Sequence, residues 1–203
     1  MLLDHGLEAG HRLHDDDSLH PARQGTQNRV PDEGPAQAAA HEADRVGLMG
    51  SGLGGALVWN SVLGPLAGRV KAVVVMQAVA SLEAVIQEHK FKAPCLRAYG
   101  LPADTPDEEA IARVAPHDPL RRLRKLQPGT PLPRTAIYHG AEDANIPPET
   151  SAIPLAEALR RAGGEVSLEL FPGVGHAVYA MGEPIERRIE AFFSFLREDR
   201  MSL

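Results

Sequence analysis

Hydrophobic positions follow two alternating patterns from about residue 45 to the end of the chain. Short runs of apolar and β-branched residues predict buried strands, and each run is followed by a stretch with helical spacing. The predicted strands are Val46–Met49, Val70–Met76, Thr135–Tyr138 and Val166–Phe171. Because strands that alternate with helices are typical of a mostly parallel sheet with helices on both faces, the sequence predicts an α/β fold.

Glycine, proline and capping residues mark the helices between these strands. They predict helices at Gly54–Leu63 and Ser81–His89, a helix that ends at Arg161, and a last helix that begins near Pro184. Hydrophobic side chains recur on one face of the last helix, at Ile185, Ile189, Phe192, Phe193 and Leu196. Such an amphipathic helix is expected to pack against the sheet.

An excursion rich in proline and charge, from about Phe91 to Pro133, separates the second and third strands. Within it, Thr105 is a candidate cap for a short helix with Pro106 at its first position, and a second helix is expected after Asp118. Two interpretations stay open. The excursion is either a lid over a site or a surface segment. The second interpretation rests on its leucines, Leu120, Leu123 and Leu126.

Residues 1–44 have a different composition. Between His20 and Arg45 the only large aliphatic residue is Val30, so no strand is predicted there. We expect 1–44 to be a polar, flexible segment and 45–203 to be the folded domain. Side chains of the types that bind divalent metals cluster near the N-terminus, but they lack a recognised ligand spacing, so we expect no metal site. They are His11, His14, Asp15, Asp16, Asp17 and His20.

Charge and cysteine content exclude several classes of protein. The 203 residues carry a formal net charge of -6, which gives no basic surface for nucleic acid. The single cysteine, Cys95, excludes an internal disulfide framework and a zinc ribbon, and it favours a reducing compartment. No apolar run is long enough for a membrane span, and the N-terminus does not have the pattern of a signal peptide. We therefore expect a cytoplasmic protein without a membrane partner.

A glycine-rich turn, Gly50-Ser51-Gly52-Leu53-Gly54, follows the first predicted strand. This strand, turn and helix are the context of a GxSxG nucleophile elbow, in which the central residue carries the attacking hydroxyl. Here the outer glycines are in register but the centre is Gly52, and the hydroxyl of Ser51 is one residue early. If Ser51 were the nucleophile, Met49 and Leu53 would occupy the crowded positions of the turn. The register therefore favours Gly52 as the tip.

A carboxylate and a histidine follow the next two strands of the predicted sheet. Asp143 lies in the segment His139–Pro147 after the third strand, and His176 ends the segment that follows the fourth. A histidine that acts as a general base needs a carboxylate on its other ring nitrogen, and neighbouring parallel strands end at the same edge of a sheet. We therefore predict an acid and base pair. The alternative is that Asp143 only caps its loop and His176 is an ordinary turn residue.

These motifs, in this order, resemble the α/β-hydrolase superfamily, and the chain from Arg45 to Leu203 is most similar to its dienelactone hydrolase and prolyl-oligopeptidase-like branch. The resemblance implies that Asp143 and His176 are the acid and base of a catalytic triad. It also implies that Gly52 occupies the nucleophile position, that the Leu53 amide is an oxyanion donor, and that no cofactor is needed. The chain departs from the family at its tip glycine and in a shortened N-terminal side.

Two functions follow from the resemblance. One is a serine hydrolase that cleaves an ester or peptide through an acyl-enzyme, with Ser51 as a displaced nucleophile. The other is a non-catalytic relative that binds a small molecule or a protein partner. The short N-terminal side also leaves the first strand with an open edge. The N-terminal segment could mask this edge, a second copy could pair with it in a homodimer, or it could promote aggregation.

Overall fold

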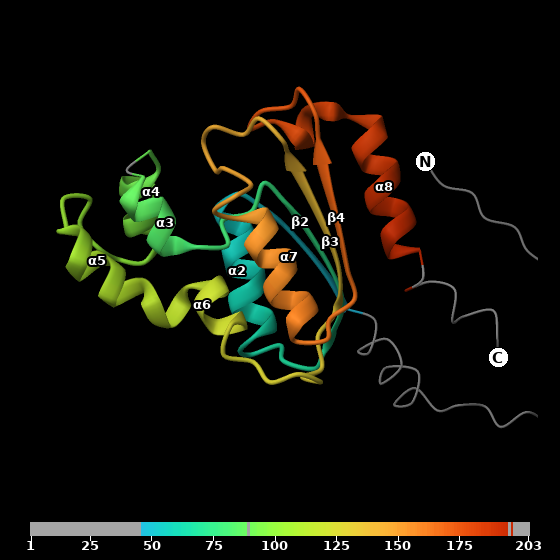
Figure 1. The fold of residues 1–203 in the computed structure, drawn as a ribbon, viewed down its shortest axis with the longest axis horizontal. Helices are drawn as coiled ribbons and strands as arrows, with labels where there is room; N and C mark the ends of the chain where they lie inside the picture. Colours follow the sequence, from blue (N-terminus) through green and yellow to red (C-terminus); the bar gives the residue numbers. More distant parts are fainter. Residues whose placement is uncertain (1–45, 89, 195, 197–203) are drawn as a thin grey trace, which may run out of the picture. The chain divides into compact units, whose positions relative to one another are not determined.

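The computed structural model describes residues 46–88, 90–194 and 196, which all belong to one compact unit. Its four strands form one parallel sheet in the order β1-β2-β3-β4 (Figure 1), which confirms the predicted α/β fold. The strands are β1 (Val46–Ser51), β2 (Val70–Met76), β3 (Arg134–Gly140) and β4 (Val166–Phe171). The expectations for residues 1–44, including the metal-type cluster, lie outside the described residues.

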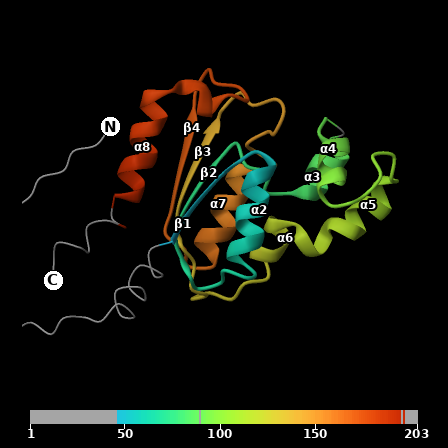
Figure 2. The same cartoon turned by 180° about the vertical axis from the view of Figure 1, so that it is seen from behind.

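Helices pack on both faces of the sheet (Figures 1 and 2). Helices α2 (Leu53–Val62) and α7 (Ala152–Arg161) pack on one face, and α8 (Glu183–Phe193) packs on the other. The core between α2, α7 and the sheet includes Trp59, Val73, Ile137, Leu155 and Leu159, which are almost fully buried. Among the described residues, no helix is both long and apolar enough to cross a membrane.

Strand β1 lies at one edge of the sheet and pairs with β2. It is two residues longer than the predicted strand, which ended at Met49, because Gly50 and Ser51 still pair with Val75 and Met76 of β2. Its outer side has no partner strand among residues 46–88, 90–194 and 196. Met49 on this strand is 54% exposed, which is unusual for a methionine in a sheet.

The excursion between β2 and β3 is helical. It follows α3 (Leu82–Gln87) and contains α4 (Lys92–Ala98), α5 (Asp107–Val114), a 3₁₀ turn at Ala115–His117, and α6 (Pro119–Leu123). Helix α4 was not predicted. Helices α3, α4 and α5 share a small core of their own, formed mainly by Leu82, Ile86, Leu96, Ala110 and Val114. Leu120 and Leu123 of α6 are buried in the main core instead, so the end of the excursion is anchored against α2 and α7.

The predicted cap of α5 is wrong. The Thr105 hydroxyl donates to the Pro102 carbonyl at 2.7 Å, and Pro106, expected at the first helical position, stands one residue before the helix with an extended backbone. Three acidic residues occupy the first turn of α5 and stabilise it through the helix dipole. The second helix expected after Asp118 is confirmed as α6, and the Asp118 side chain, whose capping role was not predicted, accepts a hydrogen bond from the Arg121 amide at 2.8 Å.

Candidate active site

Gly52 forms the tip of a sharp turn between β1 and α2. Its φ of 52° and ψ of -127° lie in a region that favours glycine. The Gly52 amide donates to the Met76 carbonyl at 3.2 Å, and the Gly52 carbonyl accepts from the Val79 amide at 2.9 Å and the Gly55 amide at 3.1 Å. The tip is therefore held between the end of β2 and the first turn of α2.

Close contacts fix which residues of the turn must be small. A Cβ atom on Gly50 would lie 2.6 Å from the Gly54 carbonyl oxygen, whereas one on Gly52 would meet nothing within 4 Å. With Gly52 as the tip, the register predicts that Gly54 lies at a crowded position of the turn. This prediction is wrong, because a Cβ atom on Gly54 would meet nothing within 4 Å. The crowded position is Gly55, where a Cβ would lie 2.3 Å from the Cβ of Ala78.

Ser51 is the last residue of β1 and pairs with Met76. Side chains alternate between the two faces of a strand, so Ser51 and Met49 project from the same face as Gly47. A Cβ on Gly47 would lie 2.7 Å from the Phe193 ring of α8, which identifies that face as the one opposite α2. The Ser51 hydroxyl therefore leaves the strand on the side away from the helix that follows the tip.

Asp143 and His176 follow neighbouring strands, as expected, and their side chains are in contact. His176 Nδ1 lies 2.8 Å from Asp143 Oδ2. The Asp143 side chain is fully buried, and the His176 side chain is 26% exposed. The other carboxylate oxygen, Asp143 Oδ1, accepts hydrogen bonds from the amides of Asn145 at 2.9 Å and Ile146 at 3.0 Å. Asp143 therefore caps its own loop and orients the histidine as well.

His139 lies beneath this pair and is completely buried. Its Nε2 is 2.8 Å from the Ile146 carbonyl oxygen and 3.4 Å from Asp143 Oδ2. Burial lowers the pKa of His139 below its ordinary value of 6.5, although the Ile146 carbonyl and Asp143 partly oppose this effect. A neutral ring that donates from Nε2 to Ile146 fits this geometry. His139 thus supports the loop that holds Asp143.

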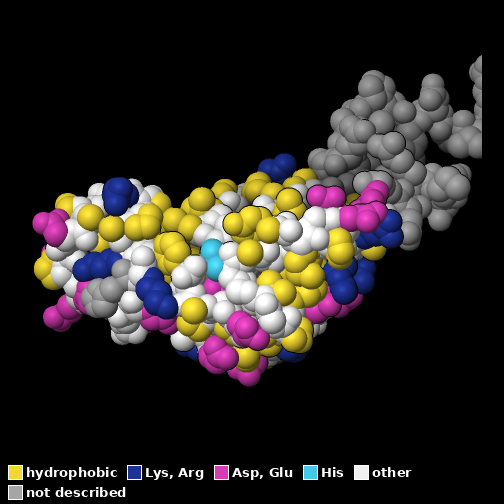
Figure 3. All heavy atoms as spheres, turned by 90° about the horizontal axis from the view of Figure 1, so that it is seen from above, with side chains coloured by type: hydrophobic (Ala, Val, Ile, Leu, Met, Phe, Trp, Pro, Cys, Tyr) yellow, Lys and Arg dark blue, Asp and Glu magenta, His cyan; other side chains and the backbone are white. Residues whose placement is uncertain are grey.

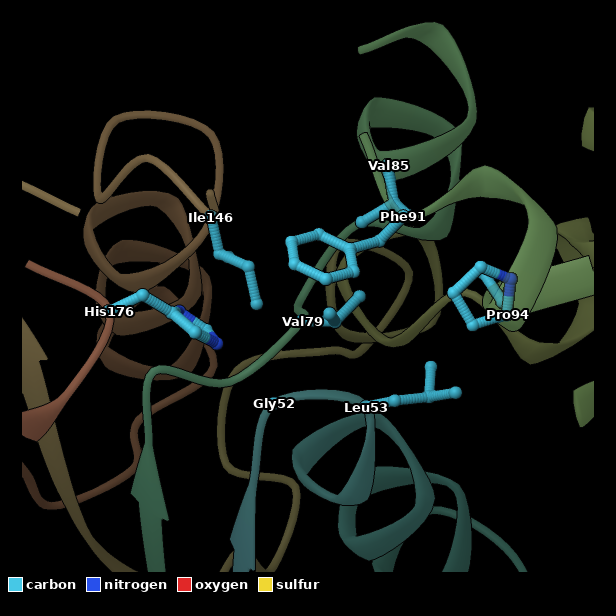
Figure 4. A pocket seen from close by; sticks show the side chains of 9 residues that line it. Gly52, Leu53, Val79, Val85, Phe91, Pro94, Ile146 and His176 are labelled. Atoms are coloured by element: carbon cyan, nitrogen blue, oxygen red, sulfur yellow. The ribbon is translucent and has the colours of Figure 1, made fainter. Parts of the chain in front are cut away.

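A pocket with an empty volume of about 410 Å³ opens between the tip and His176. Figure 4 shows the His176 ring pointing into it from one side, with Gly52 and Leu53 forming its floor. Its walls are apolar, and Ser51 is not among the described residues that line it. The remaining lining residues are Val79, Val85, Phe91, Pro94, Cys95 and Ile146. Figure 3 looks onto the carboxyl ends of the strands and shows a histidine side chain with hydrophobic side chains on one side of it.

The excursion contributes one wall of the pocket. Phe91, Pro94 and Cys95 all come from its first turns, and the Phe91 ring lies 6.0 Å from the His176 ring, centroid to centroid. The Lys90 ammonium donates to the Ala144 carbonyl and so connects the excursion to the loop of Asp143. These wall residues were not predicted from the sequence, because they belong to no motif.

Leu53 begins α2 and lines the pocket beside the tip. Amide groups in the first turn of a helix have no acceptor within the helix, and the turn has neither a capping side chain nor an acidic residue. This environment can stabilise a negative oxygen. The role of the Leu53 amide as an oxyanion donor stays a prediction.

The described part of the chain offers no metal site. No group of three or more histidine, cysteine, aspartate or glutamate side chains within it could hold a metal ion. Beside the tip, the pocket presents a histidine that contacts a buried carboxylate.

Comparisons with known proteins agree with this fold. The acylaminoacyl peptidase of Pyrococcus horikoshii superposes with a TM-score of 0.56 and 18% identity over 76% of this chain and 24% of that one. Acetyl xylan esterase 1 from Thermoanaerobacterium sp. JW/SL YS485 gives a TM-score of 0.55 and 19% identity over 76% of this chain and 46% of that one. The chain thus spans less than half the length of either protein, and these likenesses show the fold alone.

A third structure, the putative non-heme bromoperoxidase BpoC from Mycobacterium tuberculosis H37Rv, gives a TM-score of 0.50 and 16% identity over 79% of this chain and 72% of that one.

No curated protein matches the sequence. The profile of the prolyl oligopeptidase family, a peptidase family of the S9 class, matches residues 35–200, which is most of the chain. The chain has an α/β-hydrolase fold and belongs to the prolyl oligopeptidase family.

Proposed function

We propose that this domain recognises an ester or peptide through the pocket beside Gly52, as a serine hydrolase does, and binds it without forming an acyl-enzyme. The observation that carries this proposal is that Gly52 and His176 line one pocket while residue 52 has no side chain. The base and its carboxylate are in contact at 2.8 Å. At residue 52 the site lacks the serine hydroxyl oxygen that forms the covalent bond in a serine hydrolase.

The walls indicate which part of a ligand enters the pocket. Val79, Val85 and Phe91 present hydrocarbon surface, and the polar groups lie at the His176 side and at the first turn of α2. An apolar acyl or side-chain group therefore fits the walls, with its carbonyl directed toward Gly52 and Leu53. The single, buried cysteine also supports a cytoplasmic location within this proposal.

Calorimetry with N-acetylphenylalanine methyl ester tests the proposal, because this ester has an apolar side chain and a reactive carbonyl. We expect the full chain to bind it and to release no methanol. Phe91→Ala should weaken binding roughly ten- to hundredfold, since about 1.5–3 kcal/mol accompanies burial of a phenylalanine side chain. Tyr179→Ala is the matched control, because Tyr179 is an exposed aromatic residue that does not line the pocket. Absence of binding, or equal effects of both variants, would contradict the proposal.

Hydrolysis through Ser51 is the second candidate function. Ser51 is exposed and adjoins the tip, so its hydroxyl is the nearest one along the chain. Methanol release by the unmodified chain that disappears in Ser51→Ala would favour this candidate over ligand binding alone.

A further inference from the structure

Gln77 has a backbone conformation that its residue type rarely adopts. It directly follows β2, and its φ of 49° is the only positive value among the described residues other than glycine. A side chain at positive φ is strained, so surrounding contacts must hold it there. Gln77 is also completely buried, which is uncommon for a glutamine.

Backbone hydrogen bonds place Gln77 between the tip and β3. The Gln77 amide donates to the Tyr138 carbonyl at 2.9 Å, which continues the pairing of β2 with β3. Two residues later, the Val79 amide donates to the Gly52 carbonyl at 2.9 Å. The strained residue therefore lies in the segment that fixes the tip.

The Gln77 side chain reaches across to the loop of the base. Its Nε2 donates to the Gly175 carbonyl at 3.3 Å, and Gly175 immediately precedes His176. Its Oε1 has no hydrogen-bond partner among the described residues. The opposite amide orientation would place two oxygens against each other, so the donor must face Gly175. One buried amide thus connects the end of β2 to the residue before the base.

We propose that Gln77 is a positioning residue that holds the His176 loop at a fixed place relative to the Gly52 tip. The proposal rests on the function proposed above for the same site. It explains why a strained, buried polar residue occupies this position: positive φ at residue 77 directs the amide toward Gly175, and an apolar side chain there could not hold that carbonyl. Gln77 acts through His176 and need not touch the ligand.

Gln77→Met tests the proposal, because methionine keeps the length of the side chain and removes the amide. The readout is the downfield proton resonance of His176 Nδ1–H in the full chain. We expect it to shift or broaden in Gln77→Met. Thr135→Val is the control, since it removes a buried hydrogen bond, from the Thr135 hydroxyl to the Pro133 carbonyl, at the other end of the sheet. It should leave the resonance unchanged.

An unchanged resonance in Gln77→Met would overturn the proposal, and so would an equal change in the Thr135→Val control. If Gln77→Met fails to fold, Gln77→Asn replaces it, because asparagine tolerates positive φ better and its amide is one methylene too short to reach Gly175. The same two outcomes then apply to Gln77→Asn.

Kinetics separate this inference from the proposed function. In a Gly52→Ser background, Gln77→Met should lower kcat roughly ten- to hundredfold with little change in KM, because small displacements of a base have effects of that size. If Gly52→Ser is active, the same kcat with and without Gln77→Met would overturn the inference. If Gly52→Ser is inert, kcat gives no comparison, and the proton resonance of His176 decides the role of Gln77.

Discussion

A Cβ atom on Gly50 would lie 2.6 Å from the carbonyl oxygen of Gly54, a separation that side chains do not tolerate. This contact exists because β1 and α2 approach each other most closely just before and after the tip. It fixes the register of the turn independently of any motif: the residue midway between these two glycines is Gly52. The position of Gly52 at the tip of the turn thus follows from packing as well as from sequence.

Gly50→Ala should therefore destabilise the domain by about 1–3 kcal/mol, the usual range for an overpacked core. The added methyl group would also meet the Val58 side chain at 2.9 Å. Gly54→Ala is the matched control, because a Cβ there meets nothing within 4 Å and alanine favours a helix. Urea unfolding measures both variants. Equal stability of Gly50→Ala and the unmodified chain would show that the turn is wider than described.

Buried His139 makes stability depend on pH. Its folded-state pKa lies below the ordinary value of 6.5, mainly because of burial, so the unfolded chain binds a proton that the native ring does not. The contribution of the neutral, buried ring to the free energy of unfolding is fully present above pH 6.5, and it is lost as the pH falls below that value toward the folded-state pKa. The slope for one proton reaches at most about 1.4 kcal/mol per pH unit.

His139→Gln should reduce this slope, whereas His117→Gln on the exposed surface should leave it unchanged. Urea unfolding at a series of pH values between about 5 and 8 provides the comparison. The same slope in the unmodified chain and in His139→Gln would assign the dependence to other groups.

Cys95 should react slowly with thiol reagents in the native protein. It is buried, and burial together with the charge of Asp118 raises its pKa to about 11, so little thiolate is present near neutral pH. Because it is the single cysteine of the chain, a colorimetric thiol assay reports on it alone. We expect slow labelling in buffer and rapid, complete labelling in urea. Rapid labelling of the folded chain would mean that the excursion opens the pocket easily.

We propose that the outer edge of β1, which has no partner strand within the described ranges, pairs with a second copy of the chain. The strand has no charged residue or proline to protect this edge, and Met49 on it is 54% exposed. Light scattering over a range of concentrations should show a dimer that Met49→Lys converts to a monomer. Tyr179→Lys is the control, since Tyr179 is also 54% exposed but lies outside the sheet. A monomeric unmodified chain at high concentration would remove the proposal.

The two central strands, β2 and β3, were predictable because they are buried on both faces. Val70–Met76 consists almost entirely of apolar and β-branched residues. Such a run is typical of a strand that is covered on both faces of a parallel sheet. Asp143 and His176 were predictable as neighbours for a related reason: each follows a parallel strand, and adjacent parallel strands end at the same edge. Their contact at 2.8 Å agrees with that expectation, and their catalytic role stays a prediction.

The pocket walls could not be predicted in the same way. Val79 and Phe91 belong to connecting segments, where no hydrophobic period indicates which side chain faces a cavity. Gln77 gave no signal either, because its position at positive φ depends on the partners that hold it, and glutamine is not a residue that indicates such a conformation. The Thr105 cap failed because Pro106 shifted the start of α5 by one residue, a difference that local propensity does not resolve.

Labelling with a fluorophosphonate probe, followed by mass spectrometry of the modified peptide, tests the central claim most directly. The probe forms a covalent bond only with a hydroxyl activated by a nearby base. We expect no adduct on the unmodified chain and an adduct at residue 52 in Gly52→Ser, where the added side chain has open space and shares a pocket with His176. An adduct at Ser51 of the unmodified chain, lost in Ser51→Ala, would contradict the account.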